Sequence, residues 1–294
     1  MNDRASVGAH LDAACAALGA ALGLSRREAR IEARALAALA WNVTPAWLIA
    51  HDTDPIDAAA NARFQSLLAR RLAGEPVAYI GARRAFYGRD LHVTPAVLIP
   101  RPETELLVEH ALDRMPADRP CRILDLGTGS GAVAITLALE RRNATVTAVD
   151  RSPAALAVAR ANAAALGARV TFLHSDWFEA LAGQVFDGIV GNPPYVASDD
   201  PHLAALRHEP LSALVAGPAG LDDLARIIPA APAHLTAGGW LLLEHGFDQA
   251  DAVRRLLVDA GFGEVQTWQD LAGCDRVSGG KCRKTLHSRV GQSG

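Results

Sequence analysis

The 294-residue chain has few cysteines, only two lysines and no long uninterrupted apolar run. Its 4 cysteines form no Cys-x-x-Cys pair, which argues against a disulfide scaffold or a thiolate metal site. The formal net charge of −3 argues against a protein that coats nucleic acid. Polar residues and Pro45 interrupt the most apolar early window, residues 33–50, so no membrane span is predicted. With no signal peptide apparent either, we expect a cytoplasmic protein without a metal.

The first part of the chain has the pattern of short helices. Alanine, leucine and arginine dominate residues 11–73, with apolar residues every three or four positions. Ser25 and Glu28 form a capping-box pair, and Thr44-Pro45 is a typical helix start. We predict an all-α docking domain over residues 1–75. Aromatic and β-branched residues around Gly81 and Gly88 then predict a β-hairpin linker over residues 76–100.

Strands and helices alternate from Cys121 onward. Strands are predicted over 122–126, 145–149, 170–173, 186–190, 240–244 and 265–268, and helices over 103–115, 132–140, 153–166 and 221–235. This alternation predicts an α/β domain over residues 101–280, with a mostly parallel, doubly wound, Rossmann-like sheet. Residues 281–294, which hold both lysines, are predicted to be a basic, disordered tail. Ligands of such sheets bind beyond the carboxyl ends of the strands.

A glycine-rich loop follows the first of these strands. In Asp125-Leu-Gly-Thr-Gly-Ser-Gly131 the glycines let the backbone turn sharply and approach a ligand. Their spacing differs from the Gly-x-Gly-x-x-Gly of dinucleotide-binding proteins and, with the preceding acid, favours S-adenosylmethionine. Asp125 is placed to contact the cofactor's ammonium group, and the predicted cofactor-binding loop comprises Gly127, Thr128, Gly129, Ser130 and Gly131.

Three further residues follow the second and third strands. Asp150 can accept hydrogen bonds from two ribose hydroxyls, which suits S-adenosylmethionine and NAD equally. Asp176 is a candidate for holding the adenine amino group. Trp177 is a candidate for packing on the adenine ring, although an ordinary core tryptophan is the alternative.

The motif Asn192-Pro193-Pro194-Tyr195 follows the fourth strand and predicts the reacting pocket. Both prolines lack an N–H donor, so carbonyls there are available to a ligand. The Asn192 side-chain oxygen and the Pro193 carbonyl can each accept one hydrogen of an NH2 group, which directs the nitrogen lone pair toward a methyl donor. Tyr195 can pack against the flat acceptor. His245, after the fifth strand, is a weaker candidate.

Taken together, these motifs resemble the release factor glutamine methyltransferase family over nearly the whole chain. The run Leu98-Ile-Pro-Arg-Pro-Glu-Thr-Glu105 is the narrowest mark, supported by Phe86-Tyr87-Gly88, Glu209-Pro-Leu-Ser-Ala-Leu214 and Leu243-Glu-His-Gly246. The resemblance implies a class I methyltransferase fold and methyl transfer to the glutamine of the Gly-Gly-Gln motif of peptide-chain release factors. It implies that Asn192 contacts the cofactor as well as the substrate, and that Asn192 to Tyr195 bind the substrate. It also implies that a final strand, starting near Asp275, is inserted into the sheet, although Lys281-Cys-Arg-Lys-Thr285 is a poor buried strand.

Asn-Pro-Pro-Tyr motifs also occur in amino-methylases of nucleic acids, and a related enzyme acts on a ribosomal-protein glutamine. The non-basic charge balance and the helical first domain favour a protein amide over a base. A binding protein that has lost catalysis is a further alternative, against which the intact loop and the intact Asn192 motif both argue. We expect a monomer with no direct nucleic-acid or membrane partner.

Overall fold

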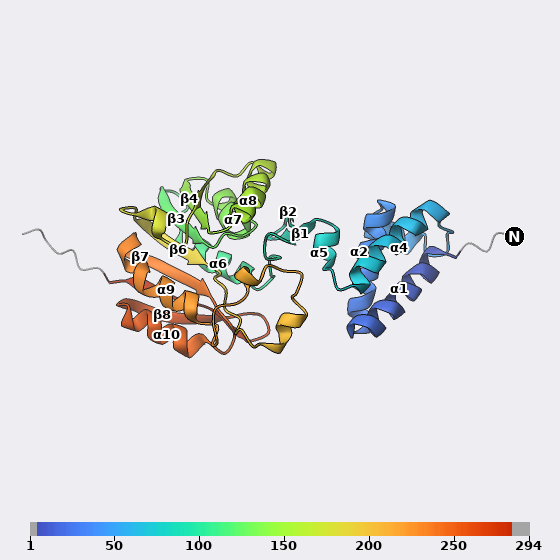
Figure 1. Cartoon of the computed structure of the whole chain (residues 1–294). Coiled ribbons are helices and arrows are strands. Elements are labelled where there is room, and N and C mark those ends of the chain that lie inside the picture. The colour runs from blue at the N-terminus through green and yellow to red at the C-terminus, as the bar shows by residue number, and fades with distance from the viewer. Residues whose placement is uncertain (1–4, 284–294) are drawn as a thin grey trace, which may run out of the picture. The chain divides into compact units, whose positions relative to one another are not determined.

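The computed structural model describes residues 5–283, which divide into two compact units between Arg83 and Arg84. Figure 1 shows the first as a helical bundle and the second as an α/β fold. No helix in the described part of the chain is long and apolar enough to span a bilayer.

The first unit is a bundle of four helices and one short helical turn. Its elements are α1 (Val7–Leu22), α2 (Arg26–Trp41), α3 (Pro45–Ala50), α4 (Ala58–Leu72) and α5 (Val77–Ile80). The predicted capping box is present, since Ser25 accepts from the Glu28 backbone and Glu28 accepts from the Ser25 backbone. Leu11, Leu36 and Phe64 are almost completely buried, so the bundle has an apolar core of its own.

The hairpin β1 (Arg83–Phe86) and β2 (Arg89–His92) packs on the second unit. Phe86 and Leu91 are buried in that unit's core. The backbone N–H of Tyr87 donates to Glu105 at 2.7 Å, and that of His92 donates to Asn162 at 2.7 Å. The hairpin is therefore part of the sheet domain's surface, and α5 precedes it where the sequence predicted only a hairpin.

The second unit contains one seven-stranded sheet in the order β5-β4-β3-β6-β7-β9-β8. Its strands are β3 (Cys121–Leu126), β4 (Ala144–Asp150), β5 (Val170–His174), β6 (Phe186–Gly191), β7 (Leu235–Glu244), β8 (Phe262–Gln269) and β9 (Asp275–Cys282). Neighbouring strands are parallel except β9, which runs antiparallel to β7 and β8. The order reverses next to β3, so the glycine loop and the Asn192 motif open at the switch point where such sheets bind ligands.

Two helical layers cover the sheet (Figure 1). α6 (Thr104–Arg114), α7 (Ala132–Glu140) and α8 (Pro153–Leu166) contribute to one apolar core, and α9 (Asp222–Ala230) and α10 (Ala250–Asp259) contribute to the other. Short 3-10 turns occur at Glu179–Leu181, Pro201–Ala204, Leu211–Ala213 and Ala231–His234. The predicted α/β class, preceded by a helical bundle and a hairpin, is confirmed.

The last strand corrects the predicted boundary at residue 280. β9 continues through Lys281 and Cys282, although the sequence suggested that these residues fit a buried strand poorly. The Lys281 side chain points to solvent and pairs with Glu264 at 3.2 Å, while Cys282 is buried. Alternation along the strand therefore accommodates the charge. The rest of the predicted tail, residues 284–294, lies outside the described residues.

Glycines make the insertion of β9 possible. A Cβ atom on Gly279 would lie 2.2 Å from the Leu241 carbonyl oxygen, and one on Gly280 would lie 2.9 Å from the Gly263 carbonyl oxygen. Backbone atoms cannot move aside as flexible side chains can. The strand is therefore tightly fitted between its neighbours at a point where hydrophobicity alone predicted no strand.

Candidate active site

A pocket lies at the carboxyl ends of β3, β4, β5 and β6 and encloses about 980 Å3 of space, part of it open to solvent. Most predicted site residues line it, namely Asp125, Gly127, Thr128, Gly129, Ser130, Asp150, Asp176, Trp177, Asn192 and Pro194. Gly131, Pro193 and Tyr195 are not among the lining residues. The topology thus gathers residues from four strand ends into one crevice, as predicted from the strand pattern.

The glycine loop has a backbone that most other residues would not adopt. Gly127, Gly129 and Gly131 have φ angles of +68°, +55° and +85°. Gly131 serves packing rather than the pocket, because a Cβ atom there would lie 2.7 Å from Ile135 Cδ1. The loop exposes the backbone of Gly127 and Gly129 toward the pocket, where a ligand can approach closely.

Asp125 stabilises this loop through hydrogen bonds. Its Oδ2 accepts a hydrogen bond from the Thr128 hydroxyl at 2.7 Å and one from the Ala134 N–H at 3.3 Å. Burial raises the pKa of this carboxyl to about 7, and the two hydrogen bonds offset only part of that effect. A cationic group bound in the pocket, such as an ammonium group, would favour the ionised form of the Asp125 carboxyl.

Asp150 ends β4 and also supports the loop. Its Oδ2 accepts from the Gly129 N–H at 2.9 Å, and its Oδ1 accepts from the Ser152 N–H at 2.8 Å. Burial raises the pKa of Asp150 despite these bonds. Each carboxylate oxygen keeps a second lone pair, so the side chain can also accept from the two hydroxyls of a ribose.

Asp176 and Trp177 form another wall of the pocket. Asp176 Oδ2 pairs with Arg226 at 2.8 Å, while its Oδ1 is buried without a hydrogen-bond partner among the described residues. Such an orphaned acceptor fits the amino group of a purine base. The Trp177 indole N–H donates to Asp223 at 3.2 Å, and the ring also packs in the core. Trp177 therefore lines the pocket and also fills the core, while its packing on an adenine ring stays a prediction.

Asn192 and Pro194 are the residues of the Asn192 motif that line the pocket. The Asn192 Nδ2 donates to the Thr104 hydroxyl at 3.2 Å, which leaves its Oδ1 free of that contact. Pro193 and Pro194 are buried and cannot donate from the backbone. The segment after Tyr195 pairs with residues 214–216, and this pairing brings residues 210–213 to the pocket.

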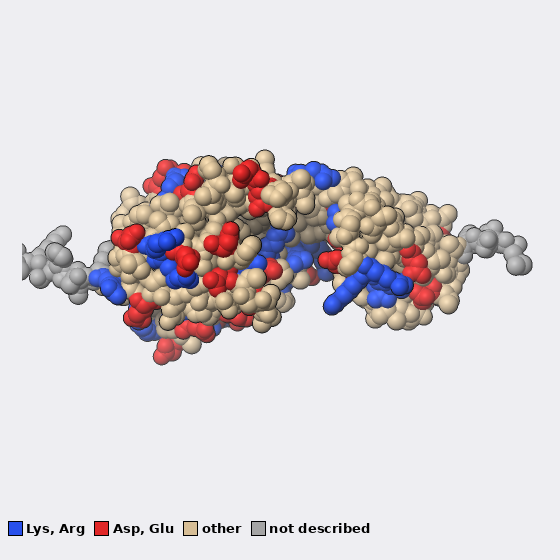
Figure 2. Space-filling view, turned by 90° about the horizontal axis from the view of Figure 1, so that it is seen from below, with Lys and Arg blue, Asp and Glu red and all other residues tan. Residues whose placement is uncertain are grey.

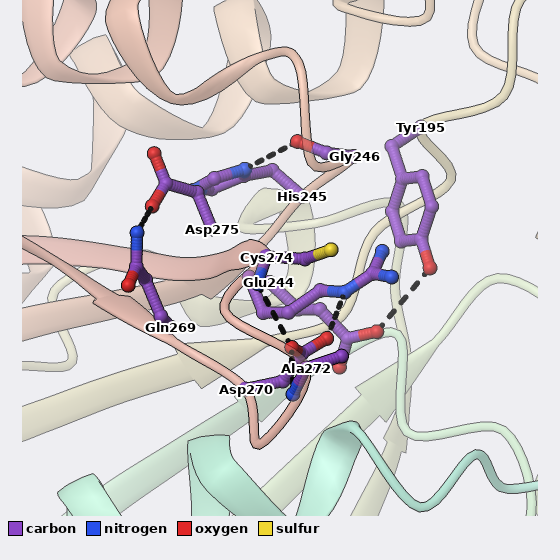
Figure 3. A network of polar contacts seen from close by, with 10 residues as sticks. Tyr195, Glu244, His245, Gly246, Gln269, Asp270, Ala272, Cys274 and Asp275 are labelled. Carbon is purple, nitrogen blue, oxygen red and sulfur yellow. Dashed lines mark hydrogen bonds and ion pairs between the residues drawn. The ribbon is translucent and has the colours of Figure 1, made fainter.

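Tyr195 lies behind the pocket wall, with its hydroxyl directed to Glu244 at the end of β7 (Figure 3). The hydroxyl donates to Glu244 Oε1 at 3.3 Å, and the Tyr195 carbonyl accepts from Gln249 at 3.0 Å. Burial and the nearby Glu244 raise the pKa of Tyr195. Burial raises the pKa of Glu244 to about 7, against the opposing effect of hydrogen bonds from Thr104 and Tyr195.

Several residues near the site received no role from the sequence. Thr104 and Glu244 contact the Asn192 motif, and Glu209 accepts from the Ile99 N–H at 3.0 Å and from Arg101 at 2.5 Å. They lie within the Leu98–Glu105, Glu209–Leu214 and Leu243–Gly246 runs that carry the family resemblance. The residues that Thr104, Glu244 and Glu209 contact are distant in the sequence. The only sequence signal for these three residues was therefore their place in the runs that carry the family resemblance.

His245 has a structural role. It is fully buried, its Nδ1 contacts the Gly246 carbonyl at 2.8 Å and its Nε2 contacts the Ser278 hydroxyl at 2.8 Å. It does not line the pocket. Across residues 5–283 no cluster of three or more His, Cys, Asp or Glu side chains could hold a metal ion.

Comparisons with known proteins agree with this arrangement. Residues 102–209 match the model of the methyltransferase small domain, and residues 11–80 match that of the PrmC N-terminal domain. The chain is 54% identical to the release factor glutamine methyltransferase of Bordetella pertussis over 85% of this chain and 94% of the relative. It is 49% identical to that of Escherichia coli over 74% and 80% of the two chains.

Among solved structures, the chain is similar to the T. thermophilus 16S rRNA N2 G1207 methyltransferase, with 26% identity and a TM-score of 0.53 over 68% of this chain and 50% of that one. A methyltransferase from Pyrococcus furiosus shares the fold, with a TM-score of 0.52 at 19% identity, over 75% of this chain and all of that one. The fold is that of S-adenosylmethionine-dependent methyltransferases. Because the sequence similarity covers 85% of the chain and both domain models match, the chain belongs to the release factor glutamine methyltransferase family.

Proposed function

We propose that this enzyme transfers the methyl group of S-adenosylmethionine to the side-chain amide nitrogen of the glutamine in the Gly-Gly-Gln motif of peptide-chain release factors. The observation that carries the proposal is Asn192 Oδ1, which accepts no hydrogen bond from residues 5–283 while Asn192 Nδ2 donates to Thr104 at the pocket wall. Close similarity to curated release factor glutamine methyltransferases supports this acceptor.

The residues present fit the proposed cofactor. Gly127 and Gly129 offer backbone without a Cβ atom, Asp150 offers acceptors for a ribose, and the buried Asp176 Oδ1 offers one for an adenine amino group. Asp125 lies where a cationic amino-acid tail would favour its ionised form. When bound, S-adenosylmethionine supplies an electrophilic methyl group on its sulfonium sulfur.

The acceptor amide nitrogen is a poor nucleophile because its lone pair is conjugated with the carbonyl. Asn192 Oδ1 and the Pro193 carbonyl accept one N–H each, which raises electron density on the nitrogen and turns its lone pair toward the methyl group. Tyr195, held by Glu244, supports the motif from behind. The proton leaves after the nitrogen becomes cationic, so the site needs no strong general base.

We also propose that the enzyme works as a cytoplasmic monomer without a direct nucleic-acid partner, with the helical first unit as its docking domain. On the face shown in Figure 2, acidic and basic side chains are interspersed, and the net charge is −3. A nucleic-acid enzyme would profit from a continuous basic surface.

Labelled S-adenosylmethionine tests the acceptor. We expect label in an added release factor and none in the same factor with the Gly-Gly-Gln glutamine replaced by alanine. Label that persists in the alanine variant, or that enters RNA or a ribosomal protein instead, would contradict the assignment.

The Asn192→Ala variant tests the pocket. Cofactor binding should largely survive, while methyl transfer falls by roughly two to four orders of magnitude because the acceptor is no longer positioned. Titration calorimetry with S-adenosylhomocysteine measures the first quantity, and single-turnover labelling measures the second. Unchanged turnover would place the acceptor elsewhere.

A further inference from the structure

Two consecutive prolines leave the Asn192 motif with few backbone donors. Pro193 and Pro194 have no N–H, so the motif cannot continue the ladder by which β6 pairs with its neighbours. One end of the motif is fixed by the sheet, because Gly191 is paired with both β3 and β7. The position of the other end therefore depends on groups outside the motif that donate to its carbonyl oxygens.

The Gln249 side chain, directly before α10, supplies such a donor. Its Nε2 donates to the Tyr195 carbonyl at 3.0 Å, and it also donates to the Ala219 and Gly220 carbonyls at 3.2 Å. Its Oε1 accepts from the Gly246 N–H at 2.8 Å. Three acceptors on one side and a donor on the other side fix the direction in which this amide points. Gln249 is 8% exposed, so water has little access to these contacts.

The carbonyls that Gln249 binds belong to the two ends of one loop. Residues 196–218, called here the motif loop, follow Tyr195 and return to Ala219. The Val196 N–H donates to the Leu214 carbonyl at 2.8 Å, so the two arms of the motif loop lie side by side. One side chain therefore joins both ends of the motif loop to the segment between β7 and α10.

The space around the Gln249 amide is closely filled. A Cβ atom on Gly220 would lie 2.1 Å from the Tyr195 carbonyl oxygen and 2.8 Å from Gln249 Nε2. Gly220 also has a φ of +67°, which favours glycine. A Cβ atom on Gly246 would lie 3.1 Å from Gln249 Oε1. These glycines allow the backbone to close around the amide, so the Tyr195 carbonyl has one well-defined place.

We propose that Gln249 is a positioning residue for methyl transfer, which holds the Tyr195 end of the motif so that the Asn192 and Pro193 oxygens keep their places around the acceptor amide. The proposal rests on the proposed function, because it assigns a task to a residue behind the same acceptor pocket. Gln249 does not line the pocket and acts through the Tyr195 backbone. A displacement of about 1 Å in such a pocket is enough to slow a reaction by roughly a hundredfold.

The cofactor side of the pocket has separate anchors. Arg151 donates to the Ser212 carbonyl at 2.8 Å, and Glu209 accepts from the Ile99 N–H at 3.0 Å. These contacts hold residues 209–212 where the motif loop borders the pocket. Loss of the Gln249 donor should therefore disturb the acceptor more than the cofactor.

Kinetics of two variants test this division. Gln249→Met keeps the length of the side chain and removes the donor, whereas Gly220→Ala pushes on the Tyr195 carbonyl from the other side. In both we expect kcat with a release factor to fall by roughly tenfold to a hundredfold. The KM for the release factor and the affinity for S-adenosylhomocysteine should stay within about threefold. Thr236→Val is the matched control, since it removes a 3.1 Å hydrogen bond to Asp187 at the amino ends of β6 and β7.

Fluorine NMR follows the motif without any acceptor present. The chain has 3 tyrosines, so 3-fluorotyrosine labelling distinguishes Tyr79, Tyr87 and Tyr195, and Tyr195→Phe assigns the last of these. We expect the Tyr195 signal to shift or broaden in Gln249→Met and Gly220→Ala and to stay unchanged in Thr236→Val. Tyr79 and Tyr87 lie one in each unit, so their unchanged signals show that both units are folded.

Three results would overturn the proposal. They are wild-type kcat in Gln249→Met, an equal fold change in kcat and in S-adenosylhomocysteine affinity, and a Tyr195 signal in Gln249→Met that matches the wild-type one. Each leaves the proposed function standing when the wild-type enzyme labels the release factor. A wild-type enzyme that does not label it refutes the proposed function, and the Tyr195 signal then decides by itself whether Gln249 anchors the motif.

Discussion

Replacing Glu244 by glutamine should stabilise the methyltransferase unit at neutral and alkaline pH. Glu244 is fully buried at the end of β7, and burial raises the pKa of its carboxyl from 4.5 to about 7. The folded protein therefore binds a proton more tightly than the unfolded chain does. The stability associated with this raised pKa is fully present below pH 4.5 and is lost as the pH rises to about 7. Glutamine has nearly the same shape and no charge to bury.

The magnitude follows from the two pKa values. A shift from 4.5 to about 7 corresponds to about 3 kcal/mol of unfolding free energy over the whole titration, at 1.36 kcal/mol per unit. Between pH 5 and pH 8 the wild-type protein should lose about 2.5 kcal/mol relative to Glu244→Gln. A unit of about 200 residues changes its Tm by roughly 2 to 4 °C per kcal/mol, so the two melting temperatures should diverge by several degrees.

Urea unfolding of both proteins at pH 5, 6, 7 and 8 measures this difference. Hydrogen exchange of β7 peptides should follow the transition, because it reports the second unit separately from the helical one. Asp125 also titrates near pH 7, but it is present in both proteins and cancels in the comparison. A difference between the two proteins that stays constant from pH 5 to pH 8 would refute the raised pKa.

Two further substitutions probe the fit of the last strand and the cofactor site. Gly279→Ala should lower the unfolding free energy of the second unit by about 1 to 3 kcal/mol, because the new methyl would lie 2.2 Å from the Leu241 carbonyl oxygen. Gly19→Ala in α1 is the control, since its new methyl would meet no atom closer than 3.4 Å. If urea unfolding shows no loss for Gly279→Ala, β9 is not packed so tightly between its neighbours. Asp150→Ala should weaken S-adenosylhomocysteine binding by roughly tenfold to a hundredfold, measured by calorimetry, and should change kcat at saturating cofactor much less. An unaltered affinity would show that Asp150 does not bind the cofactor.

The strand and helix pattern was readable because a parallel sheet covered on both faces needs continuous apolar strands. Strands β3, β4, β5 and β6 start and end within one residue or so of their predicted limits. β7 starts at Leu235, five residues before the predicted start, because Thr236, Gly238 and Gly239 look like a turn in sequence yet continue the strand. The pairing with β6 jumps from Phe186–Leu235 to Gly188–Trp240, and Gly238 has a φ of +76°, so this turn-like segment forms a bulge within the strand.

The last strand shows that a buried strand can lack hydrophobic residues. Its residues 278–280 are Ser-Gly-Gly, which score poorly as a strand, yet they are buried between β7 and β8. Their small size is what the position requires, since a Cβ atom at Gly279 has no room. Local propensity cannot reveal a demand for small size that comes from neighbours distant in the sequence.

The sequence by itself determined which strand ends carry chemistry. The glycine loop, Asp150, Asp176-Trp177 and the Asn192 motif each follow a strand, and strand ends in a parallel sheet share one edge. The tertiary structure alone decided what stands behind those residues. Thr104, Glu244 and Asp223 contact the site from α6, β7 and α9, and no spacing along the chain predicts such contacts. Polar groups buried by folding must find partners wherever the packing places them, so the contact between Asn192 and Thr104 exists only in the folded protein.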